Sequence, residues 1–248
     1  MKVIPKEIFQ TTSSAENKIL TILKQIKTAS NDLALHSLNL AQHVYKRWSE
    51  ADFILIGENG IFLLEVKGGR IKSENGIWTF TDRYGRKSRK RESPWEQAKT
   101  AFFSLEEKYL NENFKSDLKD IPMGFGVVFT DIPNFLERNS PECPPEITAF
   151  LEDCKTPGSF RLYLDRLLQY WSSKSGVNNR LAPDVIGDIL QFLRPNFDIV
   201  PPLGHQIKEI EEKFYALTKE QYSTFDAIQE NDRIIVTGGA GTGKTFIA

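Results

Sequence analysis

Residues 51–67, ADFILIGENGIFLLEVK, constrain the fold more than any other stretch of this chain. Two apolar, strand-like runs flank a GENG turn, which is the sequence signature of a β-hairpin. Three charged residues, Asp52, Glu65 and Lys67, interrupt this otherwise apolar stretch. Burying a charge without a partner is costly. The sequence therefore predicts a buried hairpin whose three charges need a physical explanation.

The turn of this hairpin decides which side chains share a face. A two-residue turn centred on Glu58-Asn59 or on Asn59-Gly60 fits the sequence. Side chains alternate between the two faces of a strand, so in either register Asp52 lies on the same face as Glu65 and Lys67. The three side chains are then direct or diagonal neighbours. We expect them to share one site.

The charges of this predicted site do not balance. Two neighbouring carboxylates repel each other, and Lys67 supplies one positive charge. A divalent cation would supply the rest, and carboxylate oxygens suit Mg²⁺ or Mn²⁺. Such a metal lowers the pKa of a bound water, while Lys67 orients or deprotonates that water. The pattern favours metal-assisted phosphodiester hydrolysis, and the alternative is a solvated sheet face with a cross-strand ion pair.

Further helices and strands are predicted around the hairpin from the spacing of apolar residues. The helices cover residues 13–26, 93–110, 159–173 and 183–195. The strands cover residues 33–41 and 124–130, and a second, short hairpin covers residues 76–93. The predicted fold class is therefore α/β, with a mixed central sheet flanked by helices.

The composition sets broad limits on function. The chain has 248 residues and a net charge of −1, so any nucleic-acid surface must be local. No apolar run is long enough to span a membrane, and the N-terminus lacks a secretory signal, which predicts a cytoplasmic protein. Cys143 and Cys154 lack metal-binding spacing. We therefore expect two reduced thiols and neither a disulfide nor a zinc site.

The charged residues of the hairpin also carry a family resemblance. Asp52 followed by Glu65-Val66-Lys67 resembles the D…ExK signature of the PD-(D/E)XK nuclease superfamily. The helix with Glu16, the phrase EADFILIGENGIFLLEVKGG and the helix with Gln97 resemble the nuclease-related domain, NERD, over roughly the first half of the chain. The resemblance implies a restriction-endonuclease-like core in which Asp52 and Glu65 bind the metal and Lys67 activates water. It also implies that Glu16 is an outer or second-metal ligand and that Gln97 lies near the metal.

Simpler explanations exist for the residues outside the hairpin. Glu16 stands three residues after Ser13, which is the spacing of a capping box at a helix start. Gln97 points away from the apolar stripe of its helix, so it either faces the site or is solvated. His36 and His43 lie in a strand-like region, where single histidines are more often structural or exposed than catalytic.

A basic cluster, RYGRKSRKR, spans residues 83–91. Such a cluster suits phosphate contacts that give affinity without sequence choice. The alternative is a solvated hairpin tip. The residues predicted to contact DNA are Arg83, Arg86, Lys87, Arg89, Lys90 and Arg91.

A glycine loop, GGAGTGKT, spans residues 238–245 and matches the phosphate-loop motif G-x-x-x-x-G-K-[ST] after a strand-like run. Its backbone amides would wrap the phosphates of ATP. The segment before it resembles that of UvrD-like superfamily 1 helicases, in which the glutamine that matches Gln221 contacts adenine, although Thr218 and Gln221 also have capping-box spacing. The predicted nucleotide-binding residues are Gln221, Gly238, Gly241, Gly243, Lys244 and Thr245.

The sequence thus predicts a nuclease-like core at residues 1–130, a helical appendage and linker at 131–200, and the start of a helicase ATP-binding domain at 201–248. Because the chain stops at Ala248, we expect no productive ATP hydrolysis by this chain alone. The predicted function is a metal-dependent DNA nuclease module of a nuclease-helicase, in DNA repair or antiviral defence. Two alternatives stay open. One is a catalytically silent DNA-binding module that recruits the motor, and the other is a regulatory domain beside a working motor.

Overall fold

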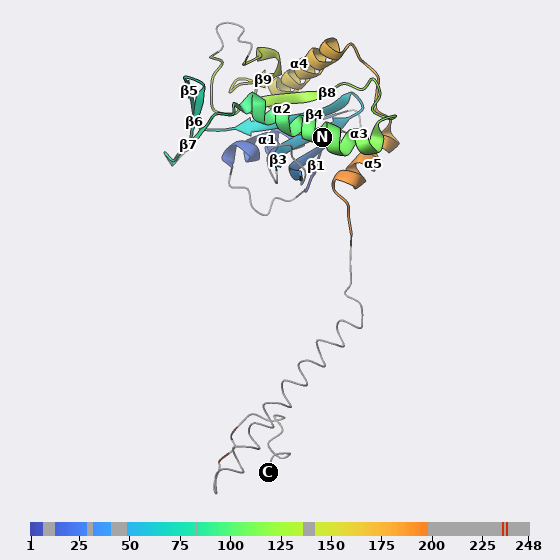
Figure 1. Ribbon diagram of the computed structural model, residues 1–248, viewed down its shortest axis with the longest axis horizontal. Helices are drawn as coiled ribbons and strands as arrows, with labels where there is room; N and C mark the ends of the chain where they lie inside the picture. Colours follow the sequence, from blue (N-terminus) through green and yellow to red (C-terminus); the bar gives the residue numbers. More distant parts are fainter. Residues whose placement is uncertain are drawn as a thin grey trace. The chain divides into compact units, whose positions relative to one another are not determined.

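The computed structural model describes residues 1–6, 13–28, 32–40, 49–82, 84–135 and 142–197, together with Ile235 and Thr237. The chain divides into two compact units, Met1–Pro195 and Asn196–Ala248. The helices and strands described below all belong to the first unit (Figure 1). Gln221 and the glycine loop at residues 238–245 lie outside the described residues, so ATP binding stays a prediction.

A mixed sheet of six strands forms the centre of the first unit. β2, β3 and β4 pair antiparallel, whereas β1 pairs parallel with β2, and β8 pairs parallel with both β4 and β9. This arrangement confirms the prediction of an α/β fold with a mixed sheet. The strands in spatial order are β1 (Lys2–Ile4), β2 (Leu33–Leu40), β3 (Ser49–Gly57), β4 (Gly60–Lys67), β8 (Met123–Phe129) and β9 (Thr148–Ala149).

The predicted hairpin lies in the middle of this sheet as β3 and β4. Gly57 pairs with Gly60, so the turn is centred on Glu58-Asn59, the first of the two registers that the sequence allowed. Every residue of β4 before Lys67 is buried. A strand buried on both faces needs helices on both sides of its sheet.

Helix α2 (Pro94–Leu105) covers one face of the sheet. The ring of Trp95 on α2 lies 5.4 Å from the ring of Phe129 on β8. Phe129 pairs with Lys67, and paired residues of neighbouring strands point to the same face. Helix α2 therefore lies on the face of the sheet that carries Lys67.

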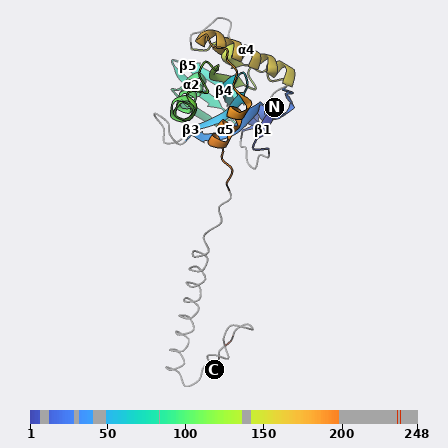
Figure 2. The same cartoon turned by 90° about the vertical axis from the view of Figure 1, so that its right-hand side faces the viewer.

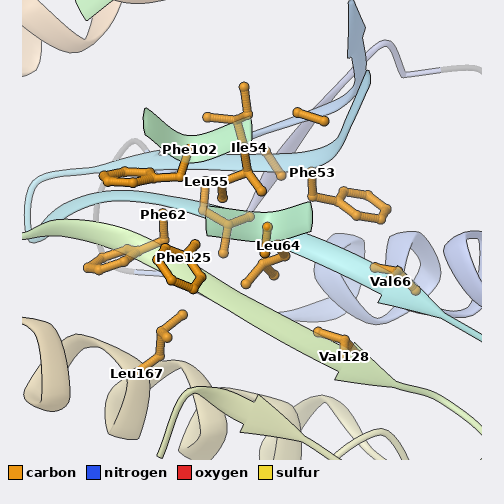
Figure 3. Packing of buried hydrophobic residues seen from close by; sticks show 14 of the residues in the cluster. Phe53, Ile54, Leu55, Phe62, Leu64, Val66, Phe102, Phe125, Val128 and Leu167 are labelled. Atoms are coloured by element: carbon orange, nitrogen blue, oxygen red, sulfur yellow. The ribbon is translucent and has the colours of Figure 1, made fainter. Parts of the chain in front are cut away.

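Helices α1 (Ser14–Gln25) and α4 (Pro157–Ser175) cover the opposite face. Phe62, which points away from the face of Lys67 because side chains alternate along β4, lines a hollow together with Leu168 of α4. Figure 2 shows the sheet between α2 and α4. In Figure 3, Phe102 of α2 and Leu167 of α4 lie on opposite sides of the central strands. The core thus has three layers.

The helix predicted over residues 93–110 changes character along its length. It begins with a complete capping box between Ser93 and Glu96. After Leu105 it continues as a π-helical turn, Glu106–Leu110, and a short helix α3, Asn111–Phe114. The two later helices are also confirmed, as α4 and as α5 (Pro183–Leu193).

A second, antiparallel sheet lies beside α2 and contains three strands. They are β5 (Arg70–Glu74), β6 (Ile77–Thr81) and β7 (Lys87–Lys90). The sequence predicted the hairpin of β6 and β7 but not β5. The ring of Trp78 on β6 lies 5.7 Å from the ring of Trp95 on α2. This aromatic contact joins the small sheet to the first turn of α2.

Two further expectations concern the chain as a whole. Within the described ranges, every helix is too short or too polar to cross a bilayer. Cys143 and Cys154 are both buried, and they are not joined to each other by a disulfide.

Candidate active site

Asp52 lies where strand pairing is interrupted on both sides of β3. The β3–β4 pairs end at Phe53 and Leu64, and the β2–β3 pairs skip the position of Ser37 opposite Asp52. The backbone N–H of Val66 donates instead to Oδ2 of Asp52, at 2.7 Å. The Asp52 carboxylate thus replaces a backbone carbonyl as the acceptor, and this hydrogen bond holds Asp52 against β4.

Glu65 and Lys67 complete the three charges of the hairpin. Because Phe53 pairs with Leu64, Asp52 and Glu65 occupy the next opposing positions of β3 and β4. Nζ of Lys67 forms an ion pair with Oε1 of Glu65. Glu65 is buried, with 7% of its surface exposed. The structure therefore supports the predicted register and the shared face of Asp52, Glu65 and Lys67.

The pKa shifts show that negative charge is in excess here. Burial raises the pKa of Asp52 well above its ordinary value, and the neighbouring charge of Glu65 raises it further. Burial alone would lower the pKa of Lys67, but the attraction of Glu65 and Asp52 outweighs burial and raises it. The shift of Asp52 thus comes first from burial, and the shift of Lys67 comes from the two carboxylates that face its ammonium group.

Glu16 approaches this cluster from α1 but has its own partner. Its backbone N–H donates to Oγ of Ser13, so half of the predicted capping box is present. The Glu16 carboxylate also reaches beyond the helix start, because its Oε2 lies 3.1 Å from Nε2 of His36 on β2. Burial opposes ionisation of Glu16, but the hydrogen bonds from His36 and Ser13 outweigh burial and lower its pKa. Glu16 therefore stays ionised and acts electrostatically on Lys67.

His36 is a candidate site residue that the sequence did not reveal. It is buried, with 2% of its surface exposed, and its ring lies 4.8 Å from the ring of Phe53. The alternating pattern of residues 33–40 predicted the strand, but no local spacing links residue 36 to residue 16. The sequence suggested that His36 is structural or exposed. The structure shows it buried, and its contact with Glu16 places it beside the candidate site.

Gln97 lies in the first turn of α2 and is buried, with 9% of its surface exposed. The solvated alternative for this residue is therefore wrong. Helix α2 packs on the face of β4 that carries Glu65 and Lys67, which explains why a residue outside the apolar stripe is covered. Within the described part of the chain, Nε2 of Gln97 has no hydrogen-bond partner. A buried amide without a partner is costly, so this donor is available to a ligand.

Two glycines, Gly68 and Gly69, connect β4 to β5. A Cβ atom at Gly68 would lie 2.8 Å from Cβ of Ala15, so α1 begins directly beside the end of β4. Gly69 has a φ of 74°, and a Cβ atom there would lie 2.3 Å from the carbonyl oxygen of Thr81. The corner after Lys67 therefore has no room for side chains, and it brings α1, β4 and the small sheet together.

Four of the nine residues of the basic cluster lie in a strand and not at a hairpin tip. Lys87, Arg89 and Lys90 belong to β7, and every residue of β7 is exposed. Arg86 pairs with Asp82 at 2.7 Å, and its guanidinium lies 5.3 Å from the centre of the Tyr84 ring. Arg91 is exposed, and Arg83 lies outside the described residues. DNA contact by these residues stays a prediction.

The residues that could hold a metal are Asp52 and Glu65. Among the described residues, no three acidic, histidine or cysteine side chains lie close enough to form a metal site by themselves. Two carboxylates fit Mg²⁺, which keeps several waters and is usually bound through one or two carboxylates together with substrate phosphates. The excess negative charge at Asp52 also fits a cation. Chemically, the arrangement can bind a hydrated divalent ion beside an ammonium group.

The sequence of this chain matches one known family of protein domains over the stretch that contains the candidate site. The family model of the nuclease-related domain, NERD, matches residues 11–130, a stretch that contains Glu16, the whole hairpin, the small sheet and Gln97. No curated protein and no protein of solved structure matches the chain. The match does not reach residues 201–248, so the start of a helicase domain there stays a prediction.

Proposed function

We propose, from the nuclease-related domain at residues 11–130, that this protein is a metal-dependent nuclease that hydrolyses phosphodiester bonds of DNA. One observation carries the proposal: Asp52 and Glu65 are held together, largely buried, with Lys67 as their immediate cation. Such a cluster is costly for the fold by itself. Strain of this kind is typical of functional sites, where binding of a ligand relieves it.

Asp52 and Glu65 are the proposed ligands of Mg²⁺ or Mn²⁺. A bound divalent ion would supply an activated water and would stabilise the charge that develops on the phosphate. Asp52 is fixed in position by the Val66 N–H, so its free oxygen keeps a constant direction. Ligands locked by such secondary contacts hold a metal in one geometry.

Lys67 is the proposed positioning group for the attacking water. Its raised pKa keeps it protonated, which favours the orienting role over proton abstraction. An ammonium group can donate to the water and to a phosphate oxygen at the same time. Glu16 is proposed as an outer or second-metal ligand, since it is ionised and acts on Lys67. Nε2 of Gln97, which has no hydrogen-bond partner among the described residues, is proposed to donate a hydrogen bond to a substrate oxygen.

The glycine loop adds a second proposal, which rests on its sequence. We infer that residues 238–245 bind the phosphates of ATP as part of a superfamily 1 helicase motor, because they match the phosphate-loop motif in full. A nuclease coupled to a helicase would act on DNA that the motor opens. The roles that fit are DNA repair and antiviral defence.

The nuclease proposal is tested by incubating the purified chain with linear, circular and single-stranded DNA in Mg²⁺, Mn²⁺ or EDTA. Glu65→Ala and Lys67→Ala should abolish metal-dependent cleavage and leave the fold and DNA binding largely intact. Lys174→Ala, at an exposed position of α4, is the matched control and should cut like the wild type. A Lys67→Ala protein that cuts at the wild-type rate would overturn the assignment. DNA binding without cleavage by the wild type would favour the silent recruitment module.

A further inference from the structure

The small sheet has two faces of different character. Strand register places Trp78, Phe80 and Ile71 on one face, because Ile71 pairs with Phe80 and side chains alternate along β6. Trp78 is buried against Trp95, and Ile71 and Phe80 pack partly against the core. This inner face anchors the sheet. The opposite face is therefore turned away from the core, and we call it the outer face.

The outer face carries four cations in a regular arrangement. Arg70 and Lys87 are the two neighbours of Thr81, and Lys72 and Arg89 are the two neighbours of Thr79. All four cations are exposed. Strand geometry places neighbours on the two sides of β6 about 10 Å apart, and successive pairs along the strands about 7 Å apart.

The outer face has a clear excess of positive charge. Its acidic residue is Glu74, which pairs with Lys72 at the end of β5 and lowers the net charge of the face by one. Glu74 also acts electrostatically on Arg89, whereas Arg70 and Lys87 lie one pair of residues further along the strands. Thr79 and Thr81 lie between the cations and offer hydroxyl donors. Ile77, which pairs with Glu74, is an exposed apolar residue on the same face. The cations and hydroxyl groups beside it match the repeated phosphates of a nucleic-acid backbone.

The outer face is joined to the candidate active site at both of its ends. Strand β5 begins at Arg70, directly after the tight Gly68-Gly69 corner that follows Lys67. Strand β7 ends at Lys90, shortly before α2, which carries Gln97. A nucleic-acid backbone bound on the outer face would therefore lie close along the chain to β4 and α2, which carry Lys67 and Gln97.

We propose that the outer face of the small sheet, through Arg70, Lys72, Lys87 and Arg89, binds the sugar-phosphate backbone of DNA and guides it to the active site. Two of these cations, Arg70 and Lys72, lie outside the basic cluster of residues 83–91. The proposal rests on the proposed nuclease function for the fate of the bound DNA, but the binding itself requires neither metal nor cleavage.

The test is DNA binding by fluorescence anisotropy in EDTA, at several salt concentrations, with labelled duplex and single-stranded DNA of mixed sequence. Each phosphate contact contributes about 0.9 to the slope of log K against log salt for duplex DNA and about 0.7 for single strands. Arg70→Ala combined with Lys72→Ala should therefore reduce the slope by about 0.9 to 1.8 for a duplex or about 0.7 to 1.4 for a single strand, because Lys72 is shared with Glu74. Affinity at about 0.1 M salt should fall by tenfold or more.

The matched control combines Lys174→Ala with Arg180→Ala, which removes the same charge from exposed positions near the end of α4. It should keep the wild-type slope. The proposal is overturned if the Arg70 and Lys72 variant keeps the wild-type slope, or if the control loses as much as that variant. Because EDTA prevents metal-dependent cleavage, a protein that binds as predicted and never cuts DNA in Mg²⁺ would refute the nuclease function alone.

Discussion

Replacing Asp52 by asparagine should stabilise the metal-free protein while it abolishes cleavage. Asp52 is costly to ionise in the folded state, first because it is buried and then because Glu65 is negative. Asn removes the charge and keeps a side-chain oxygen that can accept the Val66 N–H, which lies 2.7 Å from Oδ2 in the wild type. The substitution thus removes the electrostatic cost of the site without removing the contact that closes the strands.

Coulomb's law gives the part of the effect that comes from the neighbouring charges, and relief of the burial of the charge, the larger cause, adds to it. Opposing side chains on antiparallel strands lie about 5 Å apart, and two unit charges at that distance repel by about 3 kcal/mol at an effective dielectric constant of about 20. The attraction of Asp52 to Lys67 is lost as well and offsets part of this gain, which leaves about 1 to 2 kcal/mol. For a unit of this size the melting temperature should rise by about 2 to 8 °C.

The assay is thermal unfolding in EDTA, followed by circular dichroism, with Asp188→Asn as a control at an exposed position of α5. A carboxyl whose pKa is raised by folding contributes its stability fully below its unfolded pKa of about 3.9 and loses it as pH rises through the folded pKa. The advantage of Asp52→Asn should therefore be full at pH values above the folded pKa and should vanish in acid. Mg²⁺ should stabilise the wild type more than the variant. An Asp52→Asn protein no more stable than the wild type at neutral pH would refute the excess of negative charge.

Two further substitutions test the surroundings of the site. His36→Ala removes the hydrogen bond to Glu16 and should lower the cleavage rate by about ten- to a hundredfold. His36→Gln can keep that bond and should lower the rate less. Equal rates for His36→Ala and the wild type in a cleavage time course would rule out a role for the contact. Arg194→Met removes the guanidinium bonds to the carbonyl oxygens of Ile4, His36 and Ser37 and should lower the free energy of unfolding by about 2 kcal/mol in urea titration; an unchanged midpoint would show that these bonds contribute nothing net.

The parts of the fold that could be predicted are those with local periodic signals. The hairpin of β3 and β4 combines two long apolar runs with a turn, and the side-chain alternation of its strands holds in either turn register, so Asp52, Glu65 and Lys67 were placed on one face correctly. Helices α2, α4 and α5 have apolar stripes of several turns. In contrast, β1 and β9 are strands of three and two residues, too short for any alternation to stand out.

The parts of the candidate site that could not be predicted depend on contacts between distant segments. The Glu16–His36 contact joins a helix to a strand that is separated from it by a loop, and no spacing rule links the two residues. Burial of Gln97 depends on which face of the sheet α2 covers, and that is a consequence of the packing of Trp95 against Phe129. Strand β5 escaped notice because RIKSE is polar on its outer face and offers a single large apolar residue, Ile71, to the core.

The Gly68-Gly69 corner would have a consequence for the products of the proposed nuclease. Because a Cβ atom at Gly68 or Gly69 would lie less than 3 Å from a neighbouring atom, the corner is closely packed, and the covalent chain sets a short span from the outer face to Lys67. With DNA held on that face, the scissile phosphate falls at a constant offset from the held phosphates. Cleavage would then occur at a fixed distance from the phosphates bound on the outer face. Oligonucleotides shorter than this distance would not be cleaved, whatever the affinity of the active site for metal.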